Sequence, residues 1–162
     1  MGTTRQLVEF TRAAVDEVVA VMDELTSAGD GKGWINIGPA LTDEEAASVP
    51  VRSGLSAWFS GRGPAVPMAT WTPAATARPR PAQVGVEHGT GPDALERLRE
   101  AGSALPGTWT KRQDHAKHGI VADLPGEVPA GDVVRWMVDA VSVLSSGLVR
   151  RDAWMAVVHR PG

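Results

Sequence analysis

The chain has 162 residues, enough for a domain with its own hydrophobic core. Its formal net charge of -3 comes without any basic run. Nucleic-acid binding depends on a surplus of lysine and arginine, so we expect no nucleic-acid partner. Cysteine is absent, which excludes disulfides, thiolate catalysis and cysteine-ligated metals.

The hydropathy pattern argues against a membrane partner. No apolar run approaches the roughly 18 residues of a membrane span, and the first residues lack the apolar core of a signal peptide. We therefore expect a cytoplasmic protein. Thirteen arginines stand against three lysines, and this bias indicates a GC-rich bacterial genome.

The first part of the chain is predicted to hold one helix and two short strands. Apolar side chains from Leu7 to Leu25 follow the spacing of an amphipathic helix, which Gly29 is suited to end. Residues 34–37 and 66–71 are apolar runs typical of strands, although their pairing stays open.

The segment between these two strands is rich in Gly, Pro and Ser and is predicted to be a loop. It contains TDEEAAS, residues 42–48, a charge run that we expect to cap a short helix or to face solvent. It also contains Trp58 and Phe59. An exposed Trp-Phe pair in a loop would mark a partner surface or a lid over a pocket.

The second part of the chain has a clearer order of elements. Thr90 is placed to cap its first helix, and Gly102 is placed to end it. The order βαββαβ is that of ferredoxin-like folds. The expected strands are residues 82–88, 108–114, 119–125 and 152–160, and the expected helices are residues 90–102 and 129–147.

We therefore expect an α+β protein with a single domain, residues 1–162. A ferredoxin-like unit at residues 82–162 would carry the N-terminal helix and the two extra strands of residues 1–76. Residues 77–81 alternate Arg and Pro and should form an extended connector between these parts.

Three histidines are predicted to meet at one end of the ferredoxin-like sheet. His88 ends the first strand, His115 ends the second and His118 begins the third. Alternation along the strands would turn all three toward the face that the helices cover. Gly89, Thr90 and Gly91 lead into the first helix at the same end, and Lys117 lies at the hairpin tip. His159 would lie at the opposite end.

Four interpretations of this cluster remain open. The histidines can be polar residues that serve the fold. Three imidazoles can bind zinc, although Lys117 and the positive end of a helix disfavour a dication, and we expect no metal. A small anion can bind His88, His115, His118 and Lys117 with the backbone of residues 89–91. A histidine can also act as an acid or base, with Asp114 or Glu87 as its orienting carboxylate.

Residues 89–94, GTGPDA, match the glycine pattern of dinucleotide-binding turns only weakly, because an antiparallel hairpin follows the helix. We expect no cofactor. The sequence favours a protein that binds a small anionic ligand or a partner. The alternative is a small enzyme that uses the histidine cluster. The mixed uncovered face of the sheet also suggests a homodimer.

Overall fold

The computed structural model describes residues 2–47, 66–145, 147 and 149–162. Helices and strands are both present, so the α+β class is confirmed. In chain order the elements are β1 (Thr3–Phe10), α1 (Asp16–Ala28), β2 (Trp34–Pro39), α2 (Asp43–Ala47), β3 (Met68–Thr72), β4 (Gln83–Glu87), α4 (Ala94–Glu100), β5 (Thr110–His115), β6 (Gly119–Asp123), α5 (Ala130–Leu144) and β7 (Trp154–Pro161).

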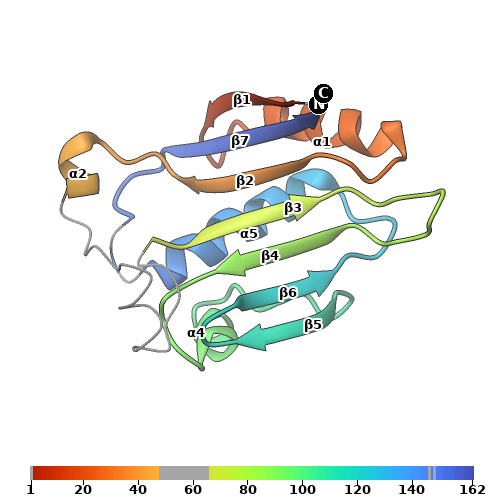
Figure 1. The fold of residues 1–162 in the computed structure, drawn as a ribbon. Coiled ribbons are helices and arrows are strands. Elements are labelled where there is room, and N and C mark those ends of the chain that lie inside the picture. The colour runs from red at the N-terminus through yellow and green to blue at the C-terminus, as the bar shows by residue number, and fades with distance from the viewer. Residues whose placement is uncertain (1, 48–65, 146, 148) are drawn as a thin grey trace.

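The seven strands form one antiparallel sheet in the order β1-β7-β2-β3-β4-β6-β5. Helices α1 and α5 lie behind this sheet in Figure 1, and α4 packs on α5. Helices α1 and α5 contact each other and the sheet, and α4 contacts α5. These three helices therefore form one layer on the layer of strands. Among the described residues, no helix lies over the other face of the sheet.

The ferredoxin-like order is not confirmed. The neighbours β4, β6 and β5 follow it, with β6 between the two parallel strands that α4 connects. The last strand does not return to β4, because β2 and β3 lie between them and β7 pairs with β1 and β2 instead. The two extra strands expected from the sequence, β2 and β3, are therefore part of the same sheet. The connection through α5 from β6 to β7 passes over three strands, whereas the corresponding connection of a ferredoxin-like fold passes over one.

The predicted N-terminal helix is wrong for its first part. Thr3–Phe10 form β1, and the helix is confined to Asp16–Ala28. Val8 and Phe10 are buried while Leu7 is 66% exposed, which is the period of two of a strand. The predicted terminator is confirmed, since Gly29 follows α1 with a φ of 70°.

One of the two remaining connections differs from expectation, and the other agrees with it. Residues 77–79 lie in a turn that joins β3 to β4, closed by backbone hydrogen bonds between Ala75 and Arg80. The expected extended connector is therefore wrong. Residues 42–47 of the TDEEAAS run do form a capped helix: Thr42 and Glu45 each accept a hydrogen bond from the other's backbone N–H at the start of α2.

The strands alternate between a buried and an uncovered face. The buried face carries Val8, Ile35, Ile37, Trp71 and Trp154, together with further apolar residues that pack under α1 and α5. From the register, the uncovered face carries Arg5, Leu7, Glu9, Trp34, Asn36, Gly38, Met68, Thr70, Thr72, Gln83, Gly85, Glu87, Val121, Asp123, Met155, Val157 and His159. The expected mixed surface on β4 and β6 is part of this set.

Candidate functional site

The structure places His115 and His118 at one end of the sheet, as expected, but on the uncovered face. A β-bulge between Lys111 and Gln113 shifts the register of β5, which reverses the expected alternation at His115, and the positive φ of Gly119 interrupts the alternation between His118 and β6. His118 lines a depression on the uncovered face, and the His115 ring stacks on it with 4.6 Å between ring centroids. The Nδ1 atom of His115 accepts the backbone N–H groups of Lys117 and His118, so this ring also holds the hairpin turn together.

His88 lies apart from this pair, because it follows Val86 on the helix-covered face and is fully buried. Its Nδ1 atom accepts hydrogen bonds from Thr90, which leaves the proton on Nε2. Nε2 is buried and has no hydrogen-bond partner among the described residues. Burial lowers the pKa of His88, Asp114 opposes that shift and Arg97 adds to it. The three histidines therefore do not form one cluster.

The glycine-rich segment before α4 does not form the expected helix start. Helix α4 begins at Ala94, and no side chain caps its first turn. Thr90 bonds to His88 instead of capping the helix, and Gly91 has a φ of 90°. With seven residues, α4 has only a weak dipole. Trp58 and Phe59 fall outside the described residues.

Trp34 is the prominent aromatic residue of the uncovered face. It is 37% exposed, and its ring lies flat on the His159 ring with 4.5 Å between centroids. Asn36 donates from Nδ2 to Nε2 of His159, while its Oδ1 accepts the Thr70 hydroxyl hydrogen bond at 2.9 Å. Burial lowers the pKa of His159, as does repulsion from Arg5. The lowered pKa favours the neutral His159 ring, which can accept the hydrogen bond from Asn36. We call the Trp34 ring, held in this way by His159, Asn36 and Thr70, the Trp34 platform.

A depression of about 260 Å³ lies beside this network, over Gly85 in the middle of β4. Thr70 and Val121 flank Gly85 on the two neighbouring strands, and His118 closes one end. The missing side chain of Gly85 creates this hollow. A Cβ at this position would meet its nearest atom, the Ile120 carbonyl oxygen, at 3.5 Å, an ordinary contact.

A larger cavity of about 730 Å³ lies where β1 and β2 end and α1 begins. Its walls include the carboxylates of Glu9, Asp16 and Glu17. Arg151 also lines it, but its guanidinium already bonds Glu45 and the Ala40 carbonyl. The lining is therefore unsuited to an anion. Sequence patterns did not reveal this cavity, because its residues come from three distant segments.

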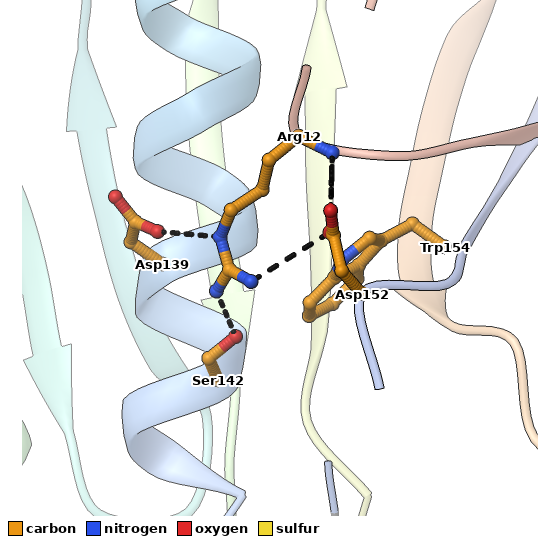
Figure 2. A network of polar contacts seen from close by, with 5 residues as sticks. All are labelled: Arg12, Asp139, Ser142, Asp152 and Trp154. Carbon is orange, nitrogen blue, oxygen red and sulfur yellow. Dashed lines mark hydrogen bonds and ion pairs between the residues drawn. The ribbon is translucent and has the colours of Figure 1, made fainter. Parts of the chain in front are cut away.

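Arg12 is the centre of a network of polar contacts beside that cavity, and the network includes the lining residue Trp154 (Figure 2). Its guanidinium bonds Asp139 at 3.1 Å and Ser142 at 2.7 Å on α5, and lies 5.5 Å from the Trp154 ring centroid. Asp152 accepts both the Arg12 backbone N–H and the Trp154 indole N–H. The contacts join the turn after β1 to α5 and to the start of β7.

Within the described ranges, no group of three or more His, Asp or Glu side chains is arranged to hold a metal ion. No helix in the same ranges has the length and apolar character to cross a membrane. No family model, curated protein or solved structure matches the chain. The fold defines a two-layer α+β protein, and its prominent surface feature is a sheet face that no helix of the described ranges covers.

Proposed function

We propose that this protein is a binding protein that holds a polypeptide partner on the uncovered face of its sheet. The observation that carries the proposal is the Trp34 platform, a partly exposed aromatic ring fixed by His159, Asn36 and Thr70. Tryptophan is enriched among the residues that dominate binding energy at protein interfaces. A ring already held in place loses little conformational entropy when a partner packs on it.

The depression over Gly85 supports the same surface. Thr70 belongs both to its wall and to the hydrogen-bond network of Asn36, so platform and hollow are continuous. Val121 and Thr72 line the hollow, a mixture suited to an apolar side chain beside backbone polar groups. A polypeptide could rest on Trp34 and insert one side chain above Gly85.

The test compares variants that alter this surface without altering the core. Trp34→Ala removes the platform, and Gly85→Val fills the depression at a position where a Cβ meets only ordinary contacts. Proteins from the native cells that bind the wild type are identified by affinity capture, and the affinity of each purified partner is then measured by calorimetry. We expect each variant to weaken binding by roughly tenfold or more.

Arg135→Glu, on the exposed side of α5, is the matched control and should leave affinity unchanged. Thermal melts must show that Trp34→Ala and Gly85→Val remain folded. Partners that bind both face variants as tightly as the wild type would show that the uncovered face is not the binding surface.

A second candidate is the small anionic ligand suggested by the sequence, now at the His115–His118 pair. The favouring observation is the stacking of two exposed imidazoles beside Lys117, since a ring N–H and an ammonium group can both donate hydrogen bonds to an anion. Glu87 lines the same depression as His118 and opposes an anion, so we expect weak binding.

Calorimetric titration with inorganic phosphate tests this candidate. Affinity should rise as the pH falls from about 8 to about 6, and Lys117→Ala should reduce it. Zinc would show the reverse pH trend, because protons compete for imidazole. Absence of heat with phosphate at both pH values would exclude the anion site.

A further inference from the structure

Strand β1 lies at one edge of the sheet that the described residues form. This strand pairs with β7 on one side, and no strand among the described residues pairs with its other side (Figure 1). Its register with β7 runs through all eight residues without a shift. Leu7, at its centre, is 66% exposed. A long, regular edge with an exposed apolar side chain is a template for a further strand.

The opposite edge of the sheet is different. Strand β5 contains the bulge between Lys111 and Gln113, and its exposed residues include Lys111, Arg112 and Asp114. Bulges and charges on an edge strand disfavour pairing with another chain. Strand β1 has no bulge, lysine or proline, and its two exposed charged side chains, Arg5 and Glu9, are of opposite sign. The two edges therefore differ in whether they resist strand addition.

On the uncovered face, β1 carries Arg5, Leu7 and Glu9 in this order. In an antiparallel copy of the strand the order is reversed, so the positive end of one copy can face the negative end of the other. If two copies of β1 pair antiparallel about a two-fold axis at Leu7, each Arg5 lies opposite a Glu9 and the leucines lie opposite each other. Opposed side chains then have Cβ atoms about 5 Å apart. Both Arg5 and Glu9 are exposed, and neither forms an ion pair within the described part of the chain.

Neighbouring registers lose this match. In the joined sheet the uncovered faces of the two copies must lie on the same side. The two-fold axis can therefore pass through Leu7 or through another residue of β1, but not between two residues. An axis at Gln6 would set Arg5 against Leu7, and an axis at Val8 would set Glu9 against Leu7. Axes at Arg5 or Glu9 would oppose like charges. Only the axis at Leu7 pairs opposite charges with each other and leucine with leucine.

We propose that two copies of this chain associate through β1, antiparallel and centred on Leu7, to form one continuous fourteen-stranded sheet from two seven-stranded ones. The two uncovered faces then join into a single surface. Glu9 lines the large cavity, so Arg5 of the second copy reaches its rim. This dimer does not depend on the proposed function.

The oligomeric state is measured first, by light scattering and sedimentation at high micromolar concentration. We expect the mass of two chains for the wild type. In the proposed dimer, residue 5 of each copy faces residue 9 of the other. Arg5→Glu places two carboxylates opposite each other at both of these contacts, and Glu9→Arg places two guanidinium groups opposite each other. Each reversal acts twice in the dimer, so each should weaken association by roughly tenfold or more.

Mixing the two reversed variants is the specific test. One copy of Arg5→Glu and one copy of Glu9→Arg place opposite charges at both contacts, so the mixture should form a tighter dimer than either variant forms alone. The double variant with both changes should also dimerise. Circular dichroism confirms that each variant is folded, and Arg112→Glu on the β5 edge should dimerise like the wild type.

Cysteine cross-linking checks the register, because the chain has no cysteine of its own. Leu7→Cys places two thiols opposite each other and should give a disulfide-linked dimer on mild oxidation. Glu9→Cys is the control. Its two copies would lie about 13 Å apart along the strands, beyond the roughly 7 Å Cα separation that a disulfide spans.

Three results would overturn the proposal: a wild type that stays monomeric at high micromolar concentration, a dimer unaffected by either charge reversal, or a mixture of the reversed variants that fails to associate. Efficient cross-linking of Glu9→Cys but not of Leu7→Cys would contradict the register.

Discussion

Gly119, at the start of β6, is the glycine with the strictest steric requirement. Its φ is +84°, and a Cβ there would overlap the carbonyl oxygen of Val86 on β4. A side chain would therefore require both a strained backbone and separation of β4 from β6.

We predict that Gly119→Ala lowers the free energy of unfolding by about 3 kcal/mol, since strain and a backbone overlap add together. The control is Gly102→Ala, where φ is +82° but nothing lies within 4 Å of the added Cβ. It should cost about 1 kcal/mol. Urea denaturation measures both. Equal losses would mean that the Val86 contact has no energetic role.

The buried His88 predicts a pH dependence of stability. The pKa of His88 is lowered in the folded protein. In the unfolded chain this histidine has its ordinary pKa of about 6.5, so near and below that pH the unfolded state binds more protons than the folded state. Stability should fall as the pH drops from about 7.5 to about 5.5. A tenfold difference in proton affinity between the two states corresponds to about 1.4 kcal/mol.

His88→Leu should remove much of this dependence, and the remainder comes from His159, whose pKa is lowered as well. His118→Gln, at an exposed position, should keep the wild-type dependence. Denaturation curves across this pH range provide the comparison. A His88→Leu protein that loses as much stability as the wild type would show that His88 does not resist protonation.

At the scale of elements, Arg12 joins the turn after β1 to α5 and β7. Arg12→Met keeps the apolar stem over Trp154 but removes the two bonds to α5. We predict a loss of about 1–2 kcal/mol, because the guanidinium is partly exposed and solvent weakens each ion pair. Arg12→Lys should recover only part of it, since an ammonium cannot bond both partners in the same geometry.

Arg135→Met is the matched control, because within the described residues Arg135 forms an ion pair with Asp132 alone, on the exposed side of the same helix. It should cost less than about 0.5 kcal/mol. Chemical denaturation of the three variants gives the comparison. Equal losses for Arg12→Met and Arg135→Met would contradict a cross-element role for Arg12.

Local patterns located most elements but misassigned residues 3–10. Strand β4, the β5–β6 hairpin, α5 and β7 lie close to their predicted positions, because their apolar spacing and turn residues agree. In residues 3–10, Val8 and Phe10 are two positions apart, which fits a strand. Leu7 continues the helical spacing of the apolar residues that follow, which fits a helix. The choice between them was made by pairing with β7, more than 140 residues away.

At the scale of the molecule, the pairing of β1 with β7 joins the two ends of the described chain. Gly2 and Gly162 are in contact, and Figure 1 shows the N and C labels side by side. Bringing such distant segments together costs loop-closure entropy before any contact forms, which slows folding.

We predict that a circular permutant folds faster. A short Gly-Ser linker would join Gly162 to Gly2, and the chain would open between Gly126 and Glu127, in an exposed loop. The β1–β7 pair then becomes a local hairpin. Stopped-flow refolding should show a faster rate than the linear chain, with a similar unfolding rate. A refolding rate equal to or below that of the linear chain would mean that this pairing forms after the rate-limiting step.

The sequence by itself determined the α+β class, most element positions, the left-handed Gly29 and the capped start of α2, since each depends on residues within a few positions of one another. It also placed His88, His115 and His118 at one end of the sheet. Tertiary structure decided the strand order, the faces of the histidines and the Trp34 platform. Those features depend on the insertion of β2 and β3 beside β7 and on a bulge in β5, and no local pattern records which distant strands will pair.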